Sequence, residues 1–347
     1  MTATLDEVLE RPGNNLNMVR VVAATAVILS HSFMLVYHDP SAQPLSWGPY
    51  NLGANAVNVF FLLSGILLAR SIERHPNWRA FALARILRIM PALLWSGVVV
   101  AVLAGLLATT LPLTAFFFSS DALLYPLYAA TQFEGAQLPA VFVDSPNPGE
   151  INRPLWTIKY ELTIYALFLV AVMLGLGRSR RFLAALTVAL GVALLALQSR
   201  EHQLGPLFSV LRFSFCFALG TCAYHYRNKL PLNGLAAVAG LVVALSLGAT
   251  PLAIVAWVFA AGYAALVLGS LHVRYLTDLA NRLDISFGLY LYGWPIQQYL
   301  LQFEPMRSSL VLHVLLSLLL AGAFAYVSAR YIEVPAMRLR RRSPVPA

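Results

Sequence analysis

Apolar runs of about twenty residues recur along this sequence, and they leave room for one class of fold. A helical run of this length matches the hydrocarbon thickness of a bilayer. Hydrophobic residues make up 59% of the 347 residues and charged residues only 11%, whereas about one-quarter of a soluble domain is charged. We therefore predict an all-α, polytopic membrane bundle of about ten helices without a soluble domain, at residues 18–37, 52–72, 90–111, 154–177, 182–198, 205–226, 232–248, 251–271, 284–303 and 308–331.

The charged residues between these runs predict the orientation of the chain. Basic residues outnumber acidic ones by 24 to 15, but they are spread over alternate loops, which indicates membrane topology rather than nucleic-acid binding. The positive-inside rule then places both termini in the cytoplasm, with a tail at 1–17, a membrane domain at 18–331 and a basic tail at 332–347. The loops predicted to be cytoplasmic contain Arg70, Arg74, Arg79, Arg85, Arg88, Arg178, Arg180, Arg181, Arg227, Lys229, Arg274 and Arg282.

The longest segment between runs, residues 112–153, is predicted to lie outside the cell. It contains an apolar stretch at 114–130 that Asp121 and Pro126 interrupt. This stretch predicts a helix at the membrane surface or re-entering the membrane, not a further span.

The first apolar run contains two ionisable residues, Arg20 near one end and His31 deeper inside. On a helix they are about 16 Å apart and within roughly 20° of the same face. Because burying such groups in hydrocarbon costs several kcal/mol, each is a candidate functional residue. They are too distant to pair, but they can hold two ends of one long ligand. The alternative for His31 is a structural histidine bonded to a backbone carbonyl.

A carboxylate and an amide are predicted at a depth similar to that of His31. Glu161, about 10 Å below the outer end of the fourth run, is the only carboxylate clearly inside a predicted span, and Asn58 lies in the second. A carboxylate beside an imidazole fixes its tautomer and stabilises the imidazolium, as a general base requires. The alternative for Glu161 is an ion pair with Lys159 or Arg153.

Arg85 and Arg88 lie three residues apart, so they share one face of a helix that leads to Pro91. With Arg20 they form a candidate phosphate site on the cytoplasmic side, since guanidinium groups bind phosphate bidentately. The alternative is that these arginines only anchor the topology.

Five motifs in order along the chain resemble the acyltransferase 3 family of integral membrane acyltransferases. The sequence departs from the family pattern at Gly293, where many family members have a histidine. The matching residues are Arg20 and His31; Val57, Phe60, Phe61, Ser64 and Gly65; Arg85, Arg88 and Pro91; Leu155, Trp156, Thr157, Ile158 and Glu161; and the closing motifs Tyr290–Pro295 and Glu333–Pro335.

The resemblance implies that residues 18–331 form a membrane acyltransferase domain in the inner membrane. It implies transfer of an acyl group, usually acetyl, from cytoplasmic acyl-CoA (acetyl-CoA) to a hydroxyl of a saccharide, a lipid-linked saccharide or a related acceptor. No permanently bound cofactor and no metal is expected; membrane lipids are expected partners. The implied roles are catalysis for His31 and Glu161, phosphate binding for Arg20, Arg85 and Arg88, and substrate contact for Asn58, Ser64 and Trp156.

Three alternatives remain open at this point. Intramembrane His and Glu also form proton relays, so a proton-coupled transporter is the main competitor, although the sequence contains neither an evident inverted repeat nor broken helices. An inactive, acceptor-binding family member is the other, because of Gly293. For Ser64, close helix packing is the alternative to a substrate contact.

Overall fold

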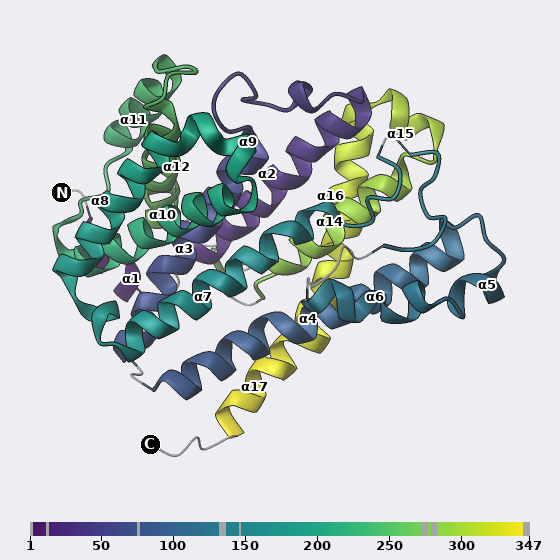
Figure 1. The fold of residues 1–347 in the computed structure, drawn as a ribbon, viewed down its shortest axis with the longest axis horizontal. Helices are drawn as coiled ribbons and strands as arrows, with labels where there is room; N and C mark the ends of the chain where they lie inside the picture. The colour runs from purple at the N-terminus through teal and green to yellow at the C-terminus, as the bar shows by residue number, and fades with distance from the viewer. Residues whose placement is uncertain are drawn as a thin grey trace. The chain divides into compact units, whose positions relative to one another are not determined.

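The computed structural model describes residues 3–11, 14–74, 77–131, 137–145, 147–271, 277–278 and 283–342, and these segments are helical with no strand among them (Figure 1). The all-α prediction is therefore confirmed. Arg274 and Arg282, assigned above to a cytoplasmic loop, lie outside the described residues, as do the ends of both predicted tails.

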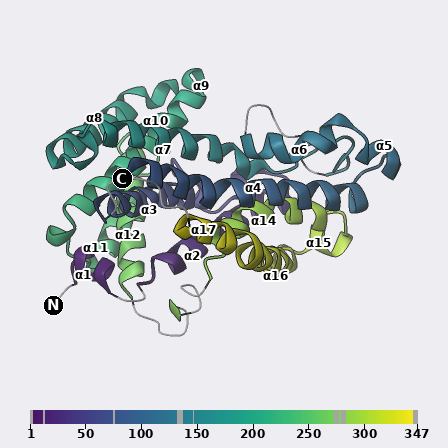
Figure 2. The same ribbon diagram turned by 90° about the horizontal axis from the view of Figure 1, so that it is seen from below.

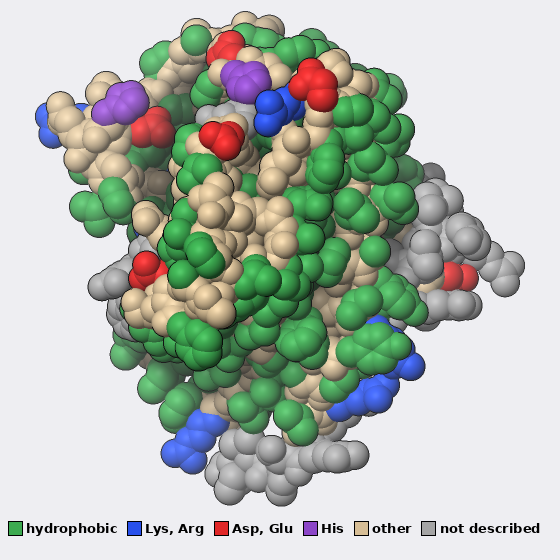
Figure 3. Space-filling view, turned by 90° about the vertical axis from the view of Figure 1, so that its right-hand side faces the viewer, with side chains coloured by type: hydrophobic (Ala, Val, Ile, Leu, Met, Phe, Trp, Pro, Cys, Tyr) green, Lys and Arg blue, Asp and Glu red, His purple; other side chains and the backbone are tan. Residues whose placement is uncertain are grey.

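Eight helical segments of the described chain are long and apolar enough to cross a membrane, and hydrophobic side chains dominate the face drawn in Figure 3. Two further predicted spans correspond to shorter helices, α11 (Gly234–Ser246) and α14 (Ser286–Leu300). The eight are Leu16–Tyr37 (α2), Leu52–Arg74 (α3), Trp78–Leu107 (α4), Arg153–Met173 (η2, Arg153–Thr157, with α7, Ile158–Met173), Arg180–Leu204 (α8, Arg180–Leu197, to α9, Glu201–Leu204), Pro206–His225 (α10), Ala253–Ser270 (α12) and Leu310–Leu339, which begins with α16 (Leu310–Ser328).

The chain forms two compact units, and each is described by itself. Unit 1 contains Met1–Ala23, Leu45–Phe81 and Tyr160–Arg282; unit 2 contains Ala24–Pro44, Ala82–Lys159 and Leu283–Ala347. The boundaries fall inside α2, α4 and α7, so each of these helices contributes residues to both units.

Unit 1 is organised around the close packing of α3 against α10. A Cβ added to Gly65 would lie 2.2 Å from the Phe217 carbonyl oxygen, and one added to Gly220 would lie 2.0 Å from the Leu62 carbonyl oxygen. Only glycine permits this approach, and the hydroxyl of Thr221 donates to the Gly65 carbonyl at 3.4 Å. Small residues at membrane helix interfaces serve this purpose.

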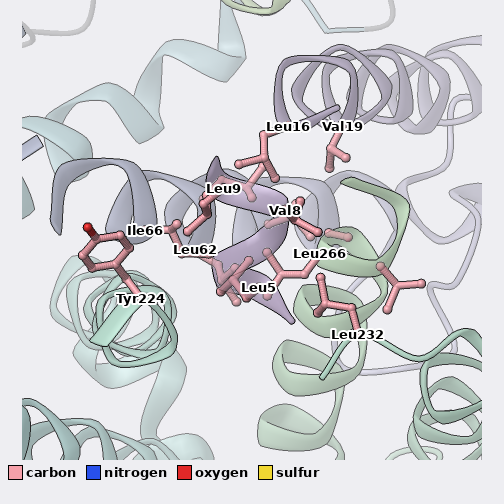
Figure 4. Packing of buried hydrophobic residues seen from close by; sticks show 14 of the residues in the cluster. Leu5, Val8, Leu9, Leu16, Val19, Leu62, Ile66, Tyr224, Leu232 and Leu266 are labelled. Carbon is pink, nitrogen blue, oxygen red and sulfur yellow. The ribbon is translucent and has the colours of Figure 1, made fainter. Parts of the chain in front are cut away.

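The predicted N-terminal tail contains a short helix, α1 (Leu5–Glu10), that packs into the core of unit 1 (Figure 4). The amide of Leu5 donates to the Leu230 carbonyl at 2.9 Å, and the Arg70 guanidinium donates to the Leu9 carbonyl at 2.6 Å. This part of the tail is therefore a docked helix. Its core neighbours include Leu16, Val19, Leu62, Ile66, Tyr224, Leu232 and Leu266.

Unit 2 contains most of α4 together with α14 and α16, which lie side by side in Figures 1 and 2. The helix that contains the predicted span 90–111, α4, begins at Trp78, and Pro91 lies inside it. A proline removes one backbone hydrogen bond from a helix, and membrane helices tolerate this where their neighbours compensate. Arg85 and Arg88 therefore belong to the same helix as the span.

Two further segments of unit 2 differ from the prediction in detail. The stretch 114–130 forms two short helices, α5 (Leu113–Phe117) and α6 (Ser120–Thr131), and Pro126 lies inside the second. After α16 the chain makes a π-helical turn, η6 (Ala329–Glu333), and continues as α17 (Val334–Arg342). The predicted C-terminal tail thus begins as a helix. π-Helical turns occur frequently at functional sites.

Candidate functional site

His31 lies in the part of α2 that belongs to unit 2, and its half-buried ring meets an aromatic residue of α14. The imidazole and the Trp294 ring are edge to face, with centroids 5.0 Å apart and planes at 89°. Trp294 is itself fixed, since its indole N–H donates to the Glu150 carbonyl at 2.8 Å and the Arg153 guanidinium lies 5.8 Å from its ring centroid. The contact orients the imidazole without occupying both of its nitrogens.

The turn of α2 that carries His31 is also held by polar contacts from α14. The Gln297 side-chain amide donates to the Ile28 carbonyl at 2.7 Å and to the Ser32 hydroxyl at 2.6 Å. A Cβ added to Gly293 would lie 2.8 Å from Cγ1 of Ile28. A larger side chain at Gly293 would therefore enter the space that Ile28 fills, and the glycine lets α14 approach α2 beside His31.

Arg88 is surrounded by two carboxylates within unit 2. Its guanidinium lies 2.8 Å from the Asp284 carboxylate and 3.1 Å from the Glu333 carboxylate, with side chains 20%, 16% and 2% exposed respectively. The three groups together have a formal charge of −1 when all are ionised. Arg85 is on the same face of α4. The sequence analysis missed Glu333 as a buried carboxylate, although the closing motif Glu333–Pro335 contained the signal.

Two of the predicted residues come together in unit 1. The Tyr165 hydroxyl lies 2.5 Å from the Glu161 carboxylate and 3.2 Å from the Ser64 hydroxyl. A single phenolic proton cannot serve both contacts, so the short one assigns it to the carboxylate and leaves the Tyr165 oxygen to accept from Ser64. Sequence reasoning missed Tyr165, one turn beyond Glu161 on the same face of α7.

Asn58 also lies in unit 1, where its side-chain oxygen accepts from the Arg212 guanidinium at 2.8 Å. Arg212 donates further to the Ala54 carbonyl at 2.9 Å, and its guanidinium is 4.1 Å from the Tyr50 ring centroid. Sequence reasoning missed Arg212, and its position in the middle of a predicted span was the available signal. The side-chain nitrogen of Asn58 is buried and has no hydrogen-bond partner in the described part of the chain.

Trp156 lies in η2 and is 41% exposed. Beside it, the Thr157 hydroxyl is 2.6 Å from the Tyr290 hydroxyl, which donates to the Pro154 carbonyl at 2.9 Å. Two motifs separated by more than a hundred residues therefore meet in unit 2. Arg20 lies on α2 within unit 1.

The candidate residues are thus divided between the units. His31, Arg85, Arg88 and Trp156 belong to unit 2, whereas Arg20, Asn58, Ser64 and Glu161 belong to unit 1. The pairing of His31 with Glu161, and that of Arg20 with the two arginines of α4, stay predictions. Among the described residues, no group of three or more His, Cys, Asp or Glu side chains is placed to hold a metal ion.

Comparisons with known proteins identify the family of this chain. The family model described as an acyltransferase domain matches residues 14–330. The chain is 24% identical to an O-acetyl transferase of Shigella phage Sf6 over 309 residues, covering 82% of this chain and 85% of the relative. It is 27% identical to nodulation protein 10 of Rhizobium leguminosarum bv. viciae over 380 residues, covering 94% of each. No solved structure matches it. This chain is an integral membrane acyltransferase and belongs to the acyltransferase 3 family.

Proposed function

We propose that this protein transfers an acyl group, in the first instance acetyl, from cytoplasmic acyl-CoA to a hydroxyl of a saccharide acceptor. The observation that carries the proposal is the His31 imidazole, held edge to face against Trp294 on an apolar helix. The name O-acetyl transferase, given to the phage Sf6 relative, supports acetyl as the group and a hydroxyl as its acceptor.

In the proposed reaction, His31 acts as the general base. Its free imidazole nitrogen takes the proton from the acceptor hydroxyl while that oxygen attacks the thioester carbonyl of acyl-CoA. The new C–O bond forms, the C–S bond breaks, and the proton passes from the imidazolium to the departing CoA sulfur. Glu161 stabilises the imidazolium, and the Tyr165 hydroxyl holds the carboxylate in one orientation.

In the same proposal, Arg20, Arg85 and Arg88 attract the phosphates of CoA. Because the Arg88 guanidinium faces Asp284 and Glu333, we also assign it a positioning role. Asn58, Ser64 and Trp156 are the proposed contacts to the rest of the substrates. The acceptor side of this assignment rests on the exposure of Trp156 and on the unpaired side-chain nitrogen of Asn58.

Replacing His31 by alanine tests the proposal. Loss of a general base lowers a rate about 10²–10⁴-fold, so we expect His31→Ala to insert normally and to lose acyl transfer by this factor. The measurement is O-ester content of surface glycans in cells that carry the gene, lack it, or carry the variant. His202→Ala, an exposed histidine on α9, is the matched control. Normal esterification by His31→Ala would refute the role of the imidazole.

A proton-coupled transporter remains the second candidate, because an intramembrane His and Glu also suit a proton relay. The two functions differ in what happens to acyl-CoA. Reconstituted transferase releases free CoA from labelled acetyl-CoA when acceptor is present, whereas a transporter moves protons and leaves the thioester intact. Proton uptake without CoA release would replace the proposal.

A further inference from the structure

A half-buried arginine, Arg212, lies near the start of α10 in unit 1. It is six residues, and therefore about 9 Å, along the helix axis from Pro206. Arg227 and Lys229 follow the other end of α10, in a loop that the positive-inside rule predicts to be cytoplasmic. The same rule therefore predicts that Arg212 lies toward the outside of the cell.

The Arg212 guanidinium is held in one orientation. Its Nε donates to the Asn58 side-chain oxygen at 2.8 Å and its Nη2 donates to the Ala54 carbonyl at 2.9 Å. Its Cζ lies 4.1 Å from the Tyr50 ring centroid and 5.0 Å from that of Phe213. Because a guanidinium has five N–H donors, three of them, including both on Nη1, have no acceptor among the described residues.

No carboxylate balances the charge of this guanidinium. Arg212 forms no ion pair with any residue that the structure describes. Arg227, just beyond the other end of α10, instead pairs with Asp6 at 2.7 Å and with Glu73 at 3.1 Å. Glu201 on α9 is exposed, so water and salt screen its charge. The guanidinium of Arg212 therefore keeps a formal charge of +1.

Two buried polar side chains that contact Arg212 also have a group without a partner. Asn58 is 2% exposed and Tyr50 is 5% exposed. Within the described ranges, neither the Asn58 side-chain nitrogen nor the Tyr50 hydroxyl forms a hydrogen bond. An amide nitrogen is only a donor, and a phenolic hydroxyl can donate. Because a buried donor without an acceptor is destabilising, this excess of donors favours binding of an anion.

The charge and the shape of the site indicate which anion it suits. A formal charge of +1 is complemented by a monoanion, and the planar fork of a guanidinium matches the two oxygens of a carboxylate. The phosphates of the donor have a proposed site at arginines on the predicted cytoplasmic side. An anion bound at the predicted outer end of α10 therefore belongs to the acceptor.

We propose that Arg212, Asn58 and Tyr50 bind a carboxylate of the acceptor, so that the acceptor is an acidic saccharide such as a hexuronic acid. Arg212 supplies the charge and its remaining N–H donors, and Asn58 and Tyr50 supply one further donor each. This inference rests on the proposed function and deepens it by naming the group that distinguishes the acceptor from neutral sugars.

The test compares two ligands that differ in one charge. Glucuronate and its methyl ester have the same ring and the same hydroxyls, but only glucuronate has a carboxylate. Saturation-transfer NMR with the purified full-length protein, in the absence of acyl-CoA, measures the dissociation constant of each ligand. In Asn58→Asp the new carboxylate can still accept from Arg212 but cancels its charge. Arg200→Gln, which removes an exposed arginine just before α9, is the matched control.

We expect the wild type and Arg200→Gln to bind glucuronate at least about tenfold more tightly than the methyl ester, because a charged acceptor forms hydrogen bonds roughly twice as strong as a neutral one. Asn58→Asp should unfold at the wild-type temperature or above it, and it should bind both ligands equally weakly. A preference for glucuronate that persists in Asn58→Asp would overturn the inference. So would a wild type that binds both ligands equally or binds neither, a result that does not depend on the folding of any variant.

Two further results separate this inference from its neighbours. Tighter binding of glucose 6-phosphate than of glucuronate by the wild type would refute the assignment of a carboxylate. Because acyl-CoA is absent from the binding assay, selective binding of glucuronate supports the site whether or not transfer occurs. The proposed transfer is decided separately by the His31→Ala experiment.

Discussion

Replacing Arg88 by methionine is the perturbation that best separates a structural ion pair from a ligand contact. Glu333, with its side chain 2% exposed, would lose the guanidinium that lies 3.1 Å from its carboxylate. Leaving a buried charge without its partner costs about 3–5 kcal/mol. The Asp284 carboxylate would keep two hydrogen bonds, because it accepts from the Ser286 amide at 3.0 Å and from the Ser286 hydroxyl at 2.6 Å. The free energy of unfolding should therefore fall by about 3–5 kcal/mol, most of it through Glu333.

A second substitution identifies the source of this loss. In the Arg88→Met background, Glu333→Gln removes the uncompensated charge and should restore at least about 2 kcal/mol, leaving the smaller deficit of the lost hydrogen bonds. Reversible unfolding in mixed micelles of the wild type, both single variants and the double variant gives the coupling free energy. The reasoning is refuted if Arg88→Met is as stable as the wild type, or if the double variant is no more stable than Arg88→Met.

The same four proteins show whether Arg88 touches the donor. If Arg88 acts only by positioning neighbouring elements, acyl-CoA affinity should return together with stability in the double variant. If Arg88 binds a phosphate directly, affinity should stay low although stability recovers. Equilibrium binding of labelled acetyl-CoA distinguishes the two results, and the first is the one we expect from the two carboxylates around the guanidinium.

Two further substitutions address the packing beside His31 and the orientation of Glu161. Gly293→Ala places a Cβ 2.8 Å from Ile28 and should destabilise by about 1–3 kcal/mol. Thermal unfolding should show partial recovery when Ile28→Ala, which removes Cγ1 and Cδ1, is combined with Gly293→Ala, and a Gly293→Ala protein as stable as the wild type would contradict the close approach. Tyr165→Phe removes the hydroxyl 2.5 Å from Glu161, so kcat should fall roughly tenfold or more, since a hydrogen bond to a charged group contributes about 1.5–3 kcal/mol. The KM for acyl-CoA should not change; a changed KM with constant kcat would argue against an orienting role.

The fold was predictable from the sequence because one physical requirement dominates it. In hydrocarbon every backbone polar group must be satisfied within its own segment, so long apolar runs become helices. Helix ends were less predictable: α4 continues through Pro91, and α1 buries Leu5 and Leu9 within a segment that reads as a polar tail. The continuation of α4 and the burial of α1 both depend on packing against neighbouring elements, which the local sequence does not reveal.

The candidate site was predictable in its ionisable residues but not in their partners. His31 and Glu161 were identifiable because a titratable group in an apolar run is costly to bury. Trp294 and Tyr165 were not, since aromatic residues are common in membrane helices and only their three-dimensional placement joins them to His31 and Glu161. The orienting contacts therefore emerge only with the fold.

An arginine inside a membrane protein is not by itself evidence of a ligand contact. A guanidinium carries five donors and a permanent charge, so in an apolar bundle it needs acceptors whether or not a ligand binds. Arg212 obtains them from Asn58 and the Ala54 carbonyl, and Arg88 from two carboxylates. The net charge of each cluster, and not the arginine alone, decides which anion it attracts. Beside Arg88 two carboxylates offset the charge of the guanidinium, so donor binding there would be coupled to the protonation or the position of Glu333 or Asp284.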